Sequence, residues 1–128
     1  MLRDSLYTII SLEHNPGLII ADIELNEDHE IFQGHFPGQP VLPGACMLQM
    51  IKEILQKEIF VSLQLKKAGV IKFLEMIIPK ENKLLQINIT YQQESAIIFR
   101  INAFIKSREK LCFKFNGTFE KRILPENK

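Results

Sequence analysis

The stretch that decides the fold is GHFPGQPVLPG, residues 34–44, together with the apolar segment that follows it. Residues 26–44 hold three of the chain's six prolines and three of its six glycines. Each proline fixes φ and restricts the residue before it, so such a loop loses little entropy when it becomes ordered. Irregular segments held in a defined shape often carry function, and we therefore expect the functional residues here.

A helix is predicted directly after this loop, from about Ala45 to Ile59. Its apolar residues recur at helical spacing over a wide arc, which indicates a largely enclosed helix. One polar stripe runs along it, formed by Gln49, Lys52, Glu53 and Gln56. Glu53 lies four residues before Lys57, a spacing typical of an exposed ion pair, so the pattern predicts a solvated Glu53.

Strand patterns lie on both sides of the loop and helix. Leu6 to Leu12 and Leu18 to Leu25 come first, separated by the turn sequence Asn15-Pro16-Gly17. Four more follow the helix, at Leu63–Ile78, Leu84–Gln92, Ala96–Ile105 and Leu111–Phe119. Short polar turns between them favour antiparallel pairing. We therefore expect one α+β domain over residues 1–128, with an antiparallel sheet around one central helix and an exposed edge that drives dimerisation.

Composition narrows the functional class. The 128 residues are 46% hydrophobic and 24% charged, with a formal net charge of +1, so nothing indicates nucleic-acid binding. Two local basic clusters are either solvated strand ends or a docking surface for an acidic carrier protein: Lys66, Lys67 and Lys72, and Lys106, Arg108 and Lys110. No segment resembles a signal peptide or a membrane span, which predicts a cytoplasmic protein. Cys46 and Cys112 lie among apolar residues and are expected as buried free thiols.

His35 is the best candidate for a catalytic group. Histidine titrates near neutral pH, and a stiff loop can hold the ring in one orientation, although loop carbonyls alone could also account for it. Gly44 and Ala45 open the helix, where backbone N–H groups have no intrahelical partner. Because Gly44 has no side chain, a ligand carbonyl could approach its N–H, as stabilisation of a thioester enolate requires. His14 and His29 are expected to be exposed.

The pattern His35-Phe36-Pro37-Gly38-x-Pro40-x-x-Pro43-Gly44 resembles the signature of the hotdog-fold 3-hydroxyacyl-acyl carrier protein dehydratases of fatty-acid synthesis. A weaker match is Ile71-Lys72-Phe73 with Pro79 six residues beyond the phenylalanine. Lys80 and Glu81 stand where that family has Gly-Asp. The resemblance implies a hotdog fold and acyl substrates carried on the phosphopantetheine of acyl carrier protein. It implies no metal, nucleotide or flavin, and a homodimer that could assemble further into a trimer of dimers.

By residue, the resemblance implies that His35 removes the α-proton of a (3R)-3-hydroxyacyl thioester and that the Gly44 N–H binds the thioester carbonyl. The family's helix acid, which comes from the partner subunit, falls here on Gln49. Glutamine donates a hydrogen bond but cannot deliver a proton to a leaving group. Further substrate contacts are expected from Phe36, Gly38, Pro43, Ala45 and Glu53.

Several alternatives stay open because of Gln49. In the first, His35 acts alone and Gln49 orients the substrate. In the second, Glu53 supplies the acid. In the third, the site binds the substrate without dehydrating it. A second hypothesis is a hotdog acyl thioesterase, which would need a carboxylate to activate water, and Gln49 is not one. A third is a catalytically weak acyl-carrier binding protein or partner subunit that borrows a complete site from a paralogue.

Overall fold

The structure is a computed structural model that describes residues 1–33 and 39–123. In chain order the elements are β1 (Tyr7–Asn15), β2 (Leu18–Leu25), a 3₁₀ turn η1 (Glu30–Phe32), α1 (Gly44–Ile59), β3 (Leu63–Phe73), β4 (Leu84–Gln93), β5 (Ile98–Ser107) and β6 (Lys110–Lys121). Six strands and one long helix are thus described, as the strand and helix patterns predict.

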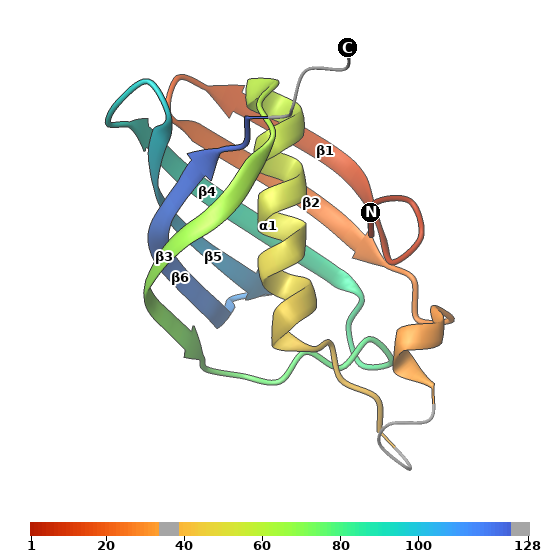
Figure 1. The fold of residues 1–128 in the computed structure, drawn as a ribbon. Coiled ribbons are helices and arrows are strands. Elements are labelled where there is room, and N and C mark those ends of the chain that lie inside the picture. The colour runs from red at the N-terminus through yellow and green to blue at the C-terminus, as the bar shows by residue number, and fades with distance from the viewer. Residues whose placement is uncertain (34–38, 124–128) are drawn as a thin grey trace.

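The six strands form one antiparallel sheet in the order β1-β2-β4-β5-β6-β3. The sheet curves around α1, which lies against its concave face (Figure 1). This is the predicted α+β hotdog arrangement. Tight turns join the sequential pairs, and Gly17 adopts the left-handed conformation (φ +80°) in the turn between β1 and β2, where glycine has no steric cost. Within the described residues, no helix is both long and apolar enough to cross a membrane.

The core lies between α1 and the concave face of the sheet. Along β2, β4 and β5 buried and less buried residues alternate, because successive strand side chains point to opposite faces. Ile51, Ile54 and Leu55 of the helix are fully buried against this face. Cys46 and Cys112 are both free and buried, as expected, and burial raises the pKa of each thiol.

Several element boundaries differ from the sequence-based expectation by one to five residues, and three of the differences have a clear physical reason. The first strand continues to Asn15, since its second half pairs with β2 up to the turn. The helix begins one residue earlier, at Gly44. The strand expected over Leu63–Ile78 ends at Phe73; after it the chain leaves the ladder, with Leu74 N–H and Glu75 N–H both donating to Cys112 O. The predicted strand was too long because apolar residues continue after Phe73, although the chain there is no longer part of the sheet.

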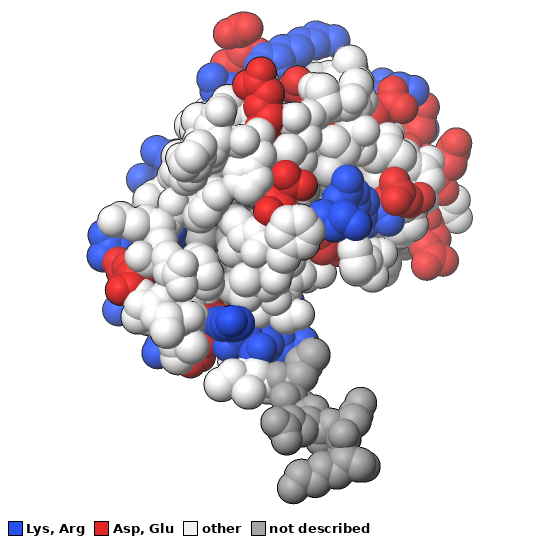
Figure 2. Space-filling view, turned by 90° about the horizontal axis from the view of Figure 1, so that it is seen from above, with Lys and Arg blue, Asp and Glu red and all other residues white. Residues whose placement is uncertain are grey.

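One edge of the sheet is formed by β3, which pairs with β6 on one side only. All of its residues except Leu63 are exposed. Several of the exposed side chains on and just after this strand are apolar: Leu65, Val70, Ile71, Phe73, Leu74 and Met76. On the face of the molecule shown in Figure 2, acidic and basic side chains are interspersed, in keeping with the small net charge. The β3 edge therefore exposes apolar side chains next to Lys66, Lys67 and Lys72 of the same strand.

Candidate active site at the start of the helix

The first turn of α1 is not capped by a side chain. Pro43 occupies the N-cap position, and its carbonyl accepts from Cys46 N–H (3.1 Å) and Met47 N–H (3.3 Å). Among the described residues, no acceptor is found for the N–H groups of Gly44 and Ala45. These two amides carry the positive end of the helix dipole and can bind an oxygen that carries partial negative charge.

A small apolar cavity of about 180 Å³ lies beside these amides. Residues from three segments line it, including Val41, Leu42, Gly44, Met47, Phe73 and Met76. The ring of Phe73 lies over Gly44 so closely that a methyl group at Gly44 would overlap it, and it also contacts Phe113, with ring centroids 5.3 Å apart. A side chain at Gly44 would therefore displace the exposed ring of Phe73.

The loop that leads into the helix is tied down where the structure describes it. Leu42 N–H donates to Ile77 O (2.8 Å), which joins the end of the loop to the segment after β3. His35, Phe36 and Gly38 lie outside the described residues. Pro43, Gly44 and Ala45 lie together at the helix start, as the sequence predicts. The proposed contacts of all six with substrate remain predictions.

Gln49 lies one and a half turns further along α1 and is half-buried. Its Nε2 donates to Oε2 of Glu53, one turn later, at 2.9 Å. Both residues are expected in the site from the sequence, and the structure brings their side chains into contact. Gln49 is therefore not a free amide but one held by a carboxylate.

Glu53 corrects the interpretation of a solvated surface residue, because it is 2% exposed. Besides Gln49 it accepts hydrogen bonds from Leu2 N–H (2.8 and 3.1 Å), Arg3 N–H (3.0 Å) and the Tyr7 hydroxyl (3.2 Å). The spacing to Lys57 is misleading, since α1 turns the carboxylate toward the N-terminal segment. The side chain ties the start of the chain to the middle of the helix.

The environment of Glu53 favours its ionised form. Burial alone would raise the pKa of the carboxyl, but the hydrogen bonds from Leu2, Gln49, Arg3 and Tyr7 outweigh burial and hold the pKa below its ordinary value. Burial and the adjacent Glu53 carboxylate raise the pKa of Tyr7, so this phenol stays neutral and donates. An ionised, fully hydrogen-bonded carboxylate has no proton to give, which does not suit the role of acid considered for Glu53.

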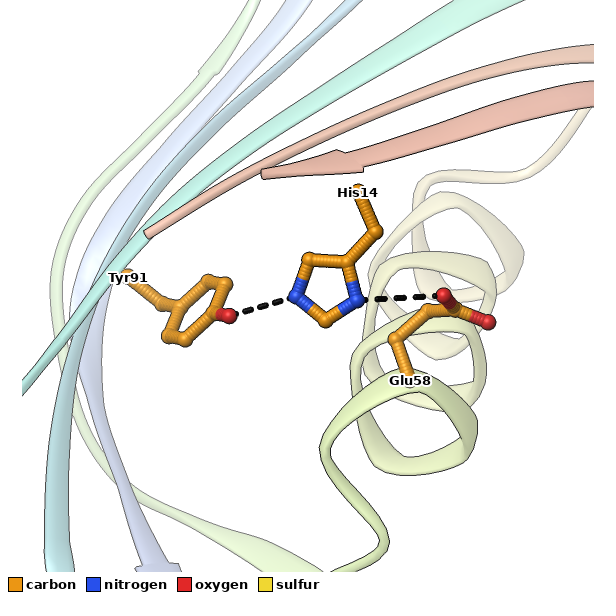
Figure 3. Close-up of polar contacts among 3 residues, drawn as sticks. All are labelled: His14, Glu58 and Tyr91. Atoms are coloured by element: carbon orange, nitrogen blue, oxygen red, sulfur yellow. Dashed lines mark hydrogen bonds and ion pairs between the residues drawn. The ribbon is translucent and has the colours of Figure 1, made fainter. Parts of the chain in front are cut away.

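A second polar cluster lies at the other end of α1 (Figure 3). His14 of β1 has Nδ1 3.2 Å from Glu58 Oε1 and Nε2 2.5 Å from the Tyr91 hydroxyl. These contacts link β1, β4 and the last turn of the helix. His29 was expected to be exposed but is half-buried, because its Nδ1 accepts from Ile31 N–H and caps η1. Both histidines therefore have structural partners.

A larger surface hollow, of about 490 Å³, adjoins the cavity at the helix start. It is lined by residues of the segment after β3 and of the turn between β5 and β6, among them Ile78, Ser107, Lys110 and Cys112. Glu75 and Met76 line both spaces. The segment after β3 thus separates two neighbouring hollows.

Comparison with known proteins agrees with this arrangement. The ApeI-like family (ApeI dehydratase) matches residues 11–117. The 3-hydroxyacyl-[acyl-carrier-protein] dehydratase FabZ of Lactobacillus helveticus is 30% identical, with 91% of this chain and 80% of that protein aligned. The FabZ of Lawsonia intracellularis is also 30% identical, over 76% of this chain and 71% of that protein.

Solved structures share the fold. The dehydratase heterocomplex ApeI:P from Xenorhabdus doucetiae superposes with a TM-score of 0.70 at 18% identity, covering 88% of this chain and 96% of that chain. A hypothetical thioesterase with coenzyme A from Streptococcus pneumoniae gives a TM-score of 0.63 at 12% identity, covering 91% and 85%. At these identities the likeness shows the hotdog fold alone. The match over residues 11–117 shows more: the chain belongs to the ApeI-like family of hotdog dehydratases.

Proposed function

We propose that this protein removes water from a (3R)-3-hydroxyacyl thioester carried on acyl carrier protein and releases the trans-2-enoyl thioester. The observation that carries the proposal is the pair of amides at Gly44 and Ala45, which have no acceptor in residues 1–33 and 39–123 and lie beside an apolar cavity, at the end of the run that holds His35. Membership in a dehydratase family supports the reaction class.

In the proposed mechanism His35 takes the proton from the carbon next to the thioester carbonyl. The electron pair moves onto the carbonyl oxygen, and the Gly44 N–H stabilises the resulting enolate. Collapse of the enolate forms the C2–C3 double bond and breaks the bond between C3 and the hydroxyl. The leaving hydroxyl takes the proton back from the His35 imidazolium and departs as water, so one histidine serves as base and then as acid.

Gln49 replaces the carboxyl acid of the family in this scheme. Its amide would hold the 3-hydroxyl in place, while Phe36, Gly38, Pro43 and Ala45 would contact the acyl thioester. Losing a separate general acid typically costs about 10²–10⁴ in rate, so we expect slow turnover. The contacts of Glu53 with Gln49 support an indirect role for Glu53 in place of a direct substrate contact.

The proposed site draws on two subunits, as the family pattern implies. The β3 edge is the surface on which we expect the second subunit, because its outer side has no strand partner in the described chain and carries exposed Leu65, Val70 and Ile71. Docking of the acidic carrier protein near Lys66, Lys67 and Lys72 of the same strand is also part of the proposal.

The test is turnover by the purified protein. With crotonyl and 3-hydroxybutyryl thioesters of pantetheine we expect reversible hydration, and His35→Ala should abolish it. Release of free thiol would instead indicate a thioesterase. Dehydration that survives in His35→Ala would contradict the mechanism.

A second candidate is a subunit that works with a paralogous partner supplying the missing acid. The observation that favours it is Gln49 itself, in the position of the family's acid. If this candidate is correct, the purified protein alone should be inactive, and Gln49→Glu should raise hydration of the crotonyl thioester by orders of magnitude. No gain in that variant would count against it.

A further inference from the structure

The hydrogen bond between Gln49 and Glu53 fixes which end of the Gln49 amide is turned toward the carboxylate. An amide has a donor end and an acceptor end, whereas an ionised carboxylate only accepts. Nε2 must therefore face Glu53, at 2.9 Å, and the carbonyl oxygen Oε1 must point away. Among the described residues, none donates a hydrogen bond to Gln49 Oε1.

Glu53 is itself held so that it cannot turn away from Gln49. Three groups on other parts of the chain approach it, namely Leu2 N–H, Arg3 N–H and the Tyr7 hydroxyl, and each of them donates. Arg3 and Tyr7 bind Oε1 of Glu53, while Gln49 binds Oε2. Since the side chain is 2% exposed, bulk water has little access to these positions. The carboxylate is therefore held in place as an acceptor, and each of the four groups around it turns its donor toward it.

We propose that Glu53 is a positioning residue that turns the carbonyl oxygen of Gln49 toward the C3 substituent of the substrate, so that the site selects a hydroxyl over a ketone. This inference rests on the proposed function. A hydroxyl donates its hydrogen to Oε1 and keeps its lone pairs free for the proton that His35 returns. A 3-oxo group only accepts, so it faces another acceptor and gains no hydrogen bond. Gln49 thus acts through its oxygen, and the specificity originates one helical turn away.

Replacing Glu53 with glutamine should reverse the orientation of Gln49. In Glu53→Gln the new carbonyl is drawn to the Oε1 position, because Arg3 N–H and the Tyr7 hydroxyl donate only there, whereas Leu2 N–H reaches both oxygens, at 3.1 Å (Oε1) and 2.8 Å (Oε2). The new NH₂ group then occupies the Oε2 position and faces Gln49. Gln49 can pair with it only by offering its own oxygen, which turns the Gln49 NH₂ group toward the substrate.

The experiment measures inhibition of crotonyl-thioester hydration by two pantetheine amide analogues, one carrying a 3-hydroxybutyryl group and the other a 3-oxobutyryl group. The wild type should prefer the hydroxy analogue by about tenfold, the value of one net hydrogen bond. In Glu53→Gln the 3-oxo analogue should gain about that factor, and the preference should disappear. A hydroxyl can accept as well as donate, so affinity for the hydroxy analogue should change little.

Tyr7→Phe is the matched control. It removes a hydrogen bond from Oε1 of Glu53 but leaves the Oε2 contact with Gln49 in place. A purely structural role of Glu53 would make both variants alike, whereas the proposal requires that only Glu53→Gln loses the preference. An unchanged preference in Glu53→Gln, or an equal loss in Tyr7→Phe, overturns the inference.

A second variant keeps the test open if Glu53→Gln does not fold. Gln49→Met keeps the side-chain length but removes both ends of the amide, so it should also abolish the preference, and a preference that persists there overturns the inference.

The ratio of the affinities for the hydroxy and the 3-oxo analogue separates this inference from the function on which it rests. A wild type that neither hydrates the crotonyl thioester nor binds either analogue removes the proposed function and the inference with it. A wild type that turns over but binds both analogues equally removes the inference alone.

Discussion

The start and the middle of α1 differ in whether their polar groups have hydrogen-bond partners. At the start, the amides of Gly44 and Ala45 have no acceptor among the described residues and lie beside an apolar cavity. In the middle, the buried carboxylate of Glu53 accepts from four different groups. Buried polar groups are costly unless they are paired. The paired carboxylate therefore stabilises the fold, and the unpaired amides are available to a ligand.

The largest effect should come from closing the helix start. Gly44→Ala places a methyl group against the ring of Phe73, in the wall of the cavity beside the amide. If that amide stabilises the enolate, dehydration should fall by about 10²–10³, the usual effect of losing one such donor. The measurement is kcat for the 3-hydroxybutyryl thioester, together with thermal unfolding.

The double variant Gly44→Ala/Phe73→Ala controls for the displaced ring. Removing the ring leaves room for the methyl group, so stability should return toward that of Phe73→Ala alone. Activity should stay low, because the methyl group still narrows the cavity beside the amide. Full activity in Gly44→Ala would show that the helix start is not where the thioester binds.

The next largest effect should come from removing the paired carboxylate. Glu53→Ala leaves the buried Tyr7 hydroxyl, Gln49 and two backbone N–H groups without their acceptor. Each such loss costs about 1–3 kcal/mol, but the N-terminal segment can move toward water, so we expect about 3 kcal/mol in the free energy of unfolding. Urea titration measures it. Glu58→Ala is the matched helix variant, and there the loss should stay below about 1 kcal/mol, since that pair is partly exposed.

The contrast between Glu53 and Glu58 also shows which features of the structure the sequence pattern could predict. Apolar runs bounded by turn residues, two of them with period-two alternation, predicted all six strands, and the apolar arc predicted α1 to within one residue. The same helical spacing suggested a solvated Glu53, because local spacing cannot show a partner 51 positions away at Leu2. The environment of Glu53 depends on how the first residues fold back over the helix. A buried tyrosine near the N-terminus and an acid on the helix were the available signals, but nothing in the pattern joins them.

In the candidate site, too, features set by local sequence were predicted, whereas contacts between distant residues were not. Proline and glycine density identified the loop and the helix start, because these residues act through local backbone geometry. The ring of Phe73 over Gly44 was not foreseen, since Phe73 was expected inside a longer strand. Likewise His14 is exposed, as expected, but its contacts with Glu58 and Tyr91 were not foreseen, because these residues lie 44 and 77 positions away.

A smaller effect should appear when pH is lowered. The folded-state pKa of Glu53 lies below the ordinary value of 4.5, so between the two values the unfolded chain binds more protons. The stabilisation from Glu53 is therefore complete above about pH 4.5 and is lost as the pH falls through the folded-state pKa. Urea titrations from pH 6 downward should show a shallower decline for Glu53→Gln than for the wild type. Parallel curves would mean that this carboxylate is not held in its ionised form.

The smallest effect should come from the cluster at the far end of the helix. Tyr91→Phe removes only the hydrogen bond to His14 Nε2 and should cost about 0.5–1.5 kcal/mol in unfolding free energy, with dehydration unchanged. His14→Ala removes both contacts of the ring and should cost slightly more. If the double variant costs no more than His14→Ala alone, the tyrosine acts only through the histidine, as the geometry in Figure 3 requires. A loss of dehydration without a loss of stability would instead assign this cluster to the reaction, and the contrast between the two ends of the helix would fail.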